Sequence, residues 1–569
     1  MVGPISYLDT IRDSFYSHYS LLDFCSVQEP TKLKIDLTED GKYITVRFNF
    51  DPYMISRCKS ILGYEWDRGG KRWLFPATKT RAYKVYDTFR DAEFSDRFTA
   101  FLQSKKEEIP NTPIPKYKTE PWAHQVKAFN FAKTKFKESG GAILNLGMGC
   151  GKSKIALDLI NNLEFKRSII VCPAKVIDVW PYQANLHSDD SLYIHPLSTK
   201  DSTAKRAEKV RNILKSGKKI AIITNYEATR RKPIRDLFAE FQWDLLVLDE
   251  CHRIKDPQGT DSKYFAKLAK EIKFKLGLTG TMLSNSPVDV FSQARFVRPE
   301  IFGKYFSRFR SEFCVMGGYG GHEILGFQNE SELAGEIREF ALEIKSEDVF
   351  PNLPKQHHIE HIISLDDKTK KIYDEWDKEF VVALENETIS ASNVLVKILK
   401  LQELTGGCIR NPETDKIHRI SSEKKEAVRE ILEGLDPAEP IVIFCRFRQD
   451  IQAVSEAFEA VGRSFGELSG KKNDLAAWQN GNFTGLICQI GSGKYGIDLT
   501  RARYMCLYSI GYISPGDFDQ VIKRQVRPGQ KSDRVTIFHL VAKGTVDRKI
   551  YQALRRKEDI IKSIMEMAR

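Results

Sequence analysis

The sequence has no cysteine pair spaced for a metal site and no hydrophobic run long enough to cross a membrane. Its 10 cysteines lie at least 18 residues apart, so we expect no thiolate zinc site. Several fall in hydrophobic runs, as expected for small core residues of a reduced, intracellular protein. The first residues carry acidic side chains without a long hydrophobic core, so we expect no signal peptide, no membrane contact and a cytoplasmic location.

Internal repeats and low-complexity segments are also missing. The 569 residues are 41% hydrophobic and 29% charged, which excludes a disordered or collagen-like chain. A chain of this length predicts about three or four domains. The net charge of +12 fits a polyanionic partner without proving one.

Hydrophobic patterning divides the chain. Residues 1–108 predict a small α+β module, and the prolines that follow predict an extended linker over 109–121. Short hydrophobic runs then alternate with helical patterns, which is typical of parallel strands covered by helices. The strands predicted in this way are 142–146, 168–172, 220–224, 244–249 and 276–280, followed by 441–445, 485–490, 504–510 and 535–541. We therefore predict an α/β fold with two tandem parallel-sheet domains, over 122–345 and 421–569, joined by a helical region over 346–420 and ending in a C-terminal brace helix.

The stretch LNLGMGCGKSKIALDLI predicts a phosphate-binding loop between a strand and a helix. Backbone N–H groups of such a loop surround phosphates, and the helix N-terminus adds positive potential. Lys152 can reach the β- and γ-phosphates, and Ser153 can bind Mg²⁺. The strict pattern requires glycine where this chain has Leu146, so a chance glycine-rich turn is the alternative. The three glycines of the loop are Gly147, Gly149 and Gly151.

The stretch DLLVLDECHRI places two carboxylates directly after a hydrophobic strand, 97 residues beyond Lys152. In an open parallel sheet that edge is where ligands bind. Asp249 is expected to hold Mg²⁺ and Glu250 to orient or deprotonate the attacking water. Alone, such a pair is usually a solvated turn. Together with the phosphate loop it predicts ATP hydrolysis, with His252 as a coupling residue.

A basic segment, DFDQVIKRQVRPGQ, lies in the second predicted domain. Gln520, Arg524, Arg527 and Gln530 have helical spacing, so we expect them on one helix face. Arg524 and Arg527 are expected to reach across a cleft as arginine fingers, so that hydrolysis requires the cleft to close.

Positions 120–555, which contain these motifs, resemble the Snf2 group of superfamily 2 helicases. GMGCGKS and DECH resemble motifs I and II, LTGTMLSNSPVDVFSQARFVRPEIFG resembles the motif III region with Met282 where proline is usual, and GSGKYGIDLTRA resembles motif V. The resemblance implies two RecA-like domains, adenine reading by Gln125, and ATP with Mg²⁺ as cofactors. It also implies nucleic-acid contacts through Pro173, Lys175, Tyr226, Arg446 and Thr500, and coupling through His252, Thr279, Gly280, Thr281, Gly496, Asp498 and Gln520.

In the N-terminal module, Gly69-Gly70 predicts a hairpin flanked by basic and aromatic residues. Such a mixture suits gripping phosphates and stacking on unpaired bases, and we expect DNA contacts there. The alternatives are that Trp73 and Phe75 are core residues and that the cations are simply solvated. The module resembles the HARP domain of annealing helicases, which implies recognition of branched DNA. The expected contacts are Arg68, Lys71, Arg72 and Trp73.

The leading hypothesis is an ATP-dependent translocase on double-stranded DNA that remodels branched DNA by fork reversal, branch migration or annealing. Replication or recombination proteins are expected partners. The alternatives are a motor that displaces proteins from DNA, an ATP-gated clamp that does not translocate, and RNA as the track.

Overall fold

The computed structural model describes residues 32–104, 109–163, 165–189, 191–197, 201–215, 217–386, 391–410, 414, 417–493, 497–510 and 515–568. The chain divides into two compact units, Met1–Lys105 and Lys106–Arg569, which are treated separately below. Within the described ranges, no helix has both the length and the hydrophobicity to span a membrane. All cysteines in these ranges are buried and free, which confirms their assignment to the core; Cys25 lies outside them.

Over its described residues, 32–104, the N-terminal unit has a five-stranded sheet, in the order β3-β4-β2-β1-β5, and three helices. The predicted mixture of helices and strands and the predicted hairpin at Gly69-Gly70 are confirmed. Its elements are β1 (Lys34–Leu37), β2 (Tyr43–Arg47), α1 (Pro52–Ser60), β3 (Glu65–Asp67), β4 (Arg72–Pro76), α2 (Lys79–Thr88), β5 (Glu93–Phe94) and α3 (Asp96–Gln103).

The hairpin corrects one predicted DNA contact. Trp73 is only 7% exposed and belongs to the core of this unit, with its ring against Tyr64 and Trp66. Strand alternation explains the outcome, because Trp73 and Phe75 point to the same covered face of β4. The exposed ring at the hairpin is Trp66, at 45%, beside the exposed cations Arg68 and Lys71.

The proline-rich segment 109–121 contains neither helix nor strand, but it is not a free spacer. Ile114 is 2% exposed in the core of the following domain. Asn162 holds the backbone of Lys116 through two hydrogen bonds, of 2.8 and 2.7 Å. This segment is therefore part of the domain that it precedes.

The first sheet of the second unit is entirely parallel, in the order β14-β6-β11-β10-β7-β9-β8. The sequence predicted its five inner strands and missed the two at its edges. The strands are β6 (Gly141–Leu146), β7 (Arg167–Cys172), β8 (Leu192–Pro196), β9 (Lys219–Asn225), β10 (Leu245–Asp249), β11 (Phe274–Thr279) and β14 (Ala341–Ile344).

Helices cover this sheet, and a separate hairpin is formed by β12 (Cys314–Gly317) and β13 (Glu323–Phe327). The hydrophobic core lies between the helices and strands such as β6, whose residues are all buried. The helices are α4 (Ala123–Glu138), α5 (Lys152–Asn162), α6 (Val179–His187), α7 (Thr203–Leu214), α8 (Tyr226–Thr229), α9 (Lys232–Glu240), α10 (Thr260–Leu268), α11 (Val290–Val297), α12 (Phe306–Phe313), α13 (Glu330–Arg338) and α14 (Ser346–Val349).

The second sheet is also entirely parallel, in the order β15-β22-β21-β18-β20-β19. Two parallel α/β sheets in tandem confirm the predicted fold class. The strands are β15 (Lys355–Ile363), β18 (Ile441–Cys445), β19 (Phe465–Leu468), β20 (Gly485–Gln489), β21 (Tyr504–Leu507) and β22 (Arg534–Ala542). Strand β15 falls within 346–420, so this stretch is not purely helical.

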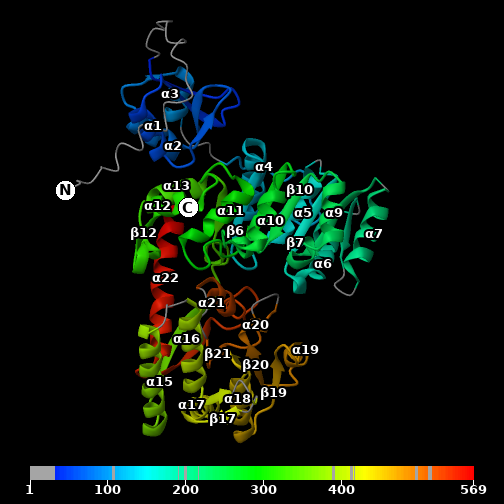
Figure 1. Cartoon of the computed structure of the whole chain (residues 1–569). Coiled ribbons are helices and arrows are strands. Elements are labelled where there is room, and N and C mark those ends of the chain that lie inside the picture. Colours follow the sequence, from blue (N-terminus) through cyan, green and yellow to red (C-terminus); the bar gives the residue numbers. More distant parts are fainter. Residues whose placement is uncertain are drawn as a thin grey trace, which may run out of the picture. The chain divides into compact units, whose positions relative to one another are not determined.

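The helices of this domain include the long C-terminal α22, red in Figure 1, which packs against α13 of the first domain and α16 of the second. It thus contacts helices of both domains, and its role as a brace stays a prediction. A short hairpin joins β16 (Cys408–Arg410) and β17 (Ile417–Arg419). The helices are α15 (Asp367–Asn386), α16 (Ala391–Thr405), α17 (Glu423–Glu433), α18 (Arg448–Ala460), α19 (Leu475–Gln479), α20 (Ile490–Gly493), α21 (Pro515–Ile522) and α22 (Val546–Ala568).

Candidate active site

Strand order gathers the predicted motifs at one edge of the first sheet. β11 lies between β6 and β10, with Thr279 opposite Asn145 and Asp249 opposite Leu278. The segments that follow these three strands are the phosphate loop, the Asp-Glu pair and the Thr-Gly-Thr turn. Because the carboxyl ends of parallel strands meet at one edge, segments far apart in the sequence form one site.

The phosphate loop runs from the end of β6 to the start of α5 at Lys152. Gly149 and Gly151 have φ of 80° and 81°, a left-handed conformation that side chains disfavour. Lys152 Nζ donates to the carbonyls of Leu146 at 2.9 Å and Gly147 at 3.3 Å, so its ammonium lies over the loop. This strand–loop–helix geometry is the one that a phosphate loop requires.

Gln125 is held against this loop. It is 3% exposed, its Oε1 accepts from the backbone N–H of Trp122 at 3.0 Å, and its Nε2 donates to the Cys150 carbonyl at 3.4 Å. A Cβ at Gly151 would lie 2.3 Å from Gln125 Nε2. Gln125 thus lies beside the loop, and its predicted role in reading adenine stays a prediction.

The two carboxylates follow β10 as predicted. Asp249 is 7% exposed and accepts a hydrogen bond from Trp180 Nε1 at 3.3 Å. Burial, together with the neighbouring charge of Glu250, raises the pKa of Asp249 to about 7, although Lys152 acts in the opposite direction. Glu250 has φ 55° and ψ 52°, a strained conformation for a non-glycine residue.

The residues at this site fit Mg²⁺. Ser153 and Asp249 line one cleft and offer only oxygen ligands, and Glu250 Oε2 is buried without a hydrogen bond. The described ranges contain no group of three or more His, Cys, Asp or Glu side chains able to hold a metal alone. Mg²⁺ commonly binds through one or two protein ligands plus substrate phosphates, which matches this donor set.

A chain of contacts leads from the carboxylates to the second domain. His252 Nδ1 lies 3.4 Å from Glu250 Oε2 and 3.0 Å from Thr279 Oγ1. Thr279 Oγ1 accepts from the backbone N–H of Thr281 at 3.1 Å, and Gln520 Nε2 donates to Thr281 Oγ1 at 3.4 Å. Burial lowers the pKa of His252, so the ring is neutral at physiological pH. The structure thus brings together four predicted coupling residues.

Both domains line a cleft of about 180 Å³. The second domain contributes Asp519, Gln520, Lys523 and Arg524. Arg524 is 5% exposed, and Lys523 forms an ion pair with Asp519 at 2.8 Å. Lys523 was not predicted as a site residue, although it directly precedes Arg524. The first domain contributes Met148, Gly149, Lys152, Ser153, Val176, Asp249, Glu250, Gly280 and Thr281.

The expectation of one helix face carrying Gln520 to Gln530 is wrong. Helix α21 ends at Ile522, and the chain continues in turns through Pro528 and Gly529, which has φ 99°. Proline and a left-handed glycine cannot continue a helix. Arg527 does not line the cleft and instead lies 3.9 Å from Asp498, while Pro528 lies 3.5 Å from where a Cβ on Gly149 would be.

The predicted DNA contacts of the two domains have different surroundings. Tyr226 is fully buried and donates to the Asp249 carbonyl at 2.8 Å, so it supports the catalytic strand rather than a DNA surface. Pro173 is buried as well, and it directly follows the inner strand β7. Lys175 is exposed, whereas Arg446 and Thr500 are half-buried. The predicted coupling residue Gly496 lies outside the described ranges.

Met282 replaces the proline that is usual after Thr-Gly-Thr, and its backbone N–H has a partner. It donates to Asn145 Oδ1 at 3.2 Å, and Asn145 in turn donates to Glu343 Oε1 at 3.2 Å. Proline lacks this N–H group. The departure from the motif is thus accommodated by a hydrogen bond that proline cannot make.

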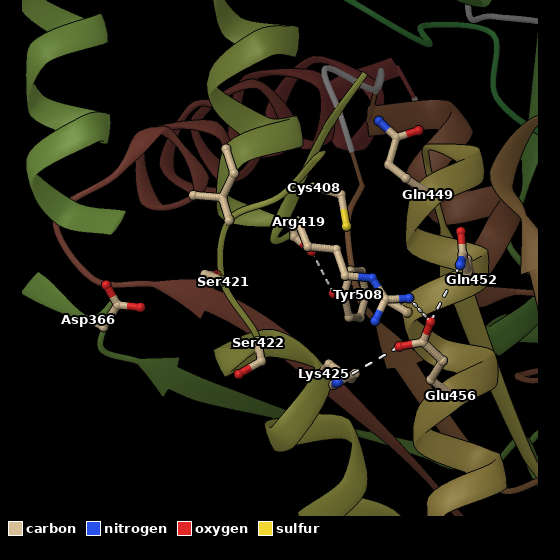
Figure 2. A pocket seen from close by; sticks show the side chains of 13 residues that line it. Asp366, Cys408, Arg419, Ser421, Ser422, Lys425, Gln449, Gln452, Glu456 and Tyr508 are labelled. Atoms are coloured by element: carbon tan, nitrogen blue, oxygen red, sulfur yellow. Dashed lines mark hydrogen bonds and ion pairs between the residues drawn. The ribbon is translucent and has the colours of Figure 1, made fainter. Parts of the chain in front are cut away.

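Another cavity, of about 270 Å³, lies beside α17 and α18 of the second domain. Figure 2 shows that Arg419 and Lys425 both reach Glu456, and the Lys425–Glu456 separation is 3.8 Å. The carboxylate offsets part of their positive charge, and no phosphate loop borders the cavity. This cavity is therefore not a second site of the same kind.

Curated proteins of several organisms are similar to this chain. An uncharacterised ATP-dependent helicase of Mycoplasma pneumoniae is 25% identical over 344 residues, 58% of this chain and 31% of the relative. The human SWI/SNF-related matrix-associated actin-dependent regulator of chromatin subfamily A member 1 is 22% identical over 471 residues, which are 78% of this chain and 44% of the relative. The rice (Oryza sativa subsp. japonica) DNA excision repair protein CSB is 25% identical over 475 residues, which are 73% of this chain and 39% of the relative. This chain spans less than half the length of these relatives.

Among solved structures, the Sulfolobus solfataricus SWI2/SNF2 ATPase core in complex with dsDNA is 23% identical, with a TM-score of 0.37. The match covers 81% of this chain and 95% of that chain. The family model of the SNF2-related domain matches residues 117–414, more than half of this chain. The N-terminal module lies outside that match, and its resemblance to HARP domains stays a prediction. The chain belongs to the Snf2 family of superfamily 2 helicases and translocases, whose members are ATP-dependent enzymes.

Proposed function

We propose that this chain is a DNA-dependent ATPase that translocates on double-stranded DNA and remodels branched DNA. One observation carries the proposal: Lys152 and Glu250 of the first domain and Arg524 of the second line the same cleft. A site shared between two domains links each round of hydrolysis to their relative movement. That link is what a motor requires and a single-domain ATPase lacks.

Within this cleft, each residue has a distinct role in hydrolysis. Lys152 and the loop N–H groups bind the β- and γ-phosphates, and Glu250 orients the attacking water. Arg524 stabilises the negative charge that develops on the transferring phosphoryl group. Mg²⁺, held by Ser153 and Asp249, would neutralise phosphate charge.

Family membership supports DNA as the track, because relatives are named for DNA excision repair and chromatin regulation. A sequence-independent grip on phosphates suits such a track. In the N-terminal unit, Trp66 projects beside Arg68 and Lys71, which is the pairing of ring and cation that suits unpaired bases at a branch.

Displacement of a third strand from a DNA triplex tests translocation. We predict that the wild-type chain displaces it only with ATP, and that Lys152→Ala abolishes both ATP hydrolysis and displacement while the fold is retained. ATP hydrolysis without displacement would favour a clamp. Hydrolysis at the wild-type rate by Lys152→Ala would refute the assigned site.

A further inference from the structure

The connection between the two sheets begins against the phosphate loop. β14 ends at Ile344, and β15, the first strand of the second sheet, begins at Lys355. The N–H of Gly147 donates to the Ile344 carbonyl at 2.9 Å. The short helix α14 and Phe350 follow immediately, so this connection forms a wall of the loop.

Gly147 and Ser346 lie closer together than any larger residue at 147 would allow. A Cβ on Gly147 would lie 2.2 Å from Ser346 Oγ and 2.5 Å from its backbone nitrogen. One of these neighbours is backbone and cannot move aside. This contact explains why the loop has glycine at 147. Leu146, which stands where the strict pattern has glycine, is fully buried in the preceding strand.

Two further contacts follow along the loop. The hydroxyl of Ser346, a residue that is 4% exposed, donates to the Met148 carbonyl at 3.0 Å. Because C=O and N–H point in opposite directions across a trans peptide, this bond directs the N–H of Gly149 away from Ser346. Phe350 packs at Gly149, where a Cβ would lie 3.6 Å from its ring, and meets Trp122 edge-on at 5.7 Å.

We propose that Ser346 is a positioning residue for the phosphate loop, and that through it the connection between the two sheets responds to bound nucleotide. The proposal rests on the nucleotide site proposed above. If the contact with Ser346 holds the loop in the conformation that binds phosphate, bound phosphate must in turn stabilise that contact, because coupling between two sites acts equally in both directions. The connection that leads into β15 is thereby coupled directly to nucleotide occupancy.

Ser346→Ala in the full chain tests the role of the hydroxyl. Loss of one hydrogen bond that orients the loop is expected to weaken binding of a fluorescent ADP analogue about fivefold. The KM for ATP is expected to rise by more than kcat falls. Ser346→Thr, which keeps the hydroxyl, should bind more tightly than Ser346→Ala. Ser455→Ala, which also removes a hydroxyl that donates to a backbone carbonyl, is the matched control and should bind as wild type.

Hydrogen exchange of residues 345–354 gives a readout independent of activity. ADP is expected to slow exchange there in the wild type, and less so in Ser346→Ala. Unchanged affinity in Ser346→Ala, equal losses in the alanine and threonine variants, or no nucleotide effect on this segment would each overturn the proposal. Wild-type affinity in Lys152→Ala would instead contradict the nucleotide site itself.

Discussion

Among the single residues, Asp249 is buried and is also the carboxylate that we expect to hold Mg²⁺. Its pKa is raised to about 7, so the folded chain retains a proton that an unfolded chain loses near pH 4. The folded state therefore binds more protons between these values, and its stability falls as pH rises from about 4 to about 7. The buried negative charge of ionised Asp249 thus destabilises the folded state, and a bound cation would offset this destabilisation.

We predict that Asp249→Asn is more stable than the wild type at pH 8 without nucleotide, by roughly 2 kcal/mol, because the buried charge is removed. Thermal melts between pH 5 and pH 8 check this. The gap between variant and wild type should widen as pH rises, and a gap that does not change with pH would contradict the assigned pKa.

The positions of single residues in the fold could be predicted where the neighbouring sequence determines them. The phosphate loop and the Asp-Glu pair follow hydrophobic strands in the sequence, so their position at a sheet edge could be inferred. Trp73 and Tyr226 were assigned to DNA wrongly, because their burial depends on what packs over them. Trp180, which donates to Asp249 from 69 residues away, had no local signal.

At the scale of elements, the strands that sequence analysis missed are β8, β14, β15 and β19, which are the edge strands of the two sheets. An inner strand of a parallel sheet is covered on both faces and reads as a hydrophobic run. β15 instead reads KQHHIEHII, with most side chains exposed or half-buried. Hydrophobic runs therefore predicted the middle of each sheet but not its edges.

We propose that the contacts from His252 to Gln520 couple DNA binding to ATP hydrolysis. Thr279→Val keeps the shape of the side chain but removes the hydroxyl that joins His252 to the Thr281 backbone. Leaving buried groups unpaired costs about 1–3 kcal/mol. We predict that the ratio of DNA-stimulated to basal ATPase rate falls at least about fivefold.

Thr545→Val is the matched control for this experiment. Thr545 is also buried, and its hydroxyl also accepts from the backbone N–H two residues later, but it lies directly before α22, outside this set of contacts. Its stimulation ratio should match that of the wild type. An equal fall in both variants would show that general destabilisation, not coupling, explains the effect.

At the scale of the whole molecule, the N-terminal unit is expected to supply the preference for branches. Arg68→Glu with Lys71→Glu removes two exposed cations beside Trp66. We predict that the preference for forked over blunt duplex is lost. We also predict that the salt dependence of DNA binding falls by the amount expected for the loss of about one phosphate contact per cation. Fluorescence anisotropy at several salt concentrations measures both.

Lys34→Glu with Lys42→Glu makes the same charge change elsewhere on this unit, where both lysines are exposed. This control should keep the preference for forks. If both double variants behave alike, net charge rather than the hairpin explains binding. If neither changes the preference, the branch-recognition role of the unit is wrong.

We propose that the two domains bind one triphosphate between them while they hold duplex DNA. The most direct test is the ATPase rate of the wild type and of Arg524→Ala, with and without blunt duplex, using Arg503→Ala as a control outside the cleft. The account predicts at least about tenfold stimulation of the wild type and the control, and none of Arg524→Ala. Stimulation of Arg524→Ala equal to that of the wild type, or no stimulation of either, would contradict it.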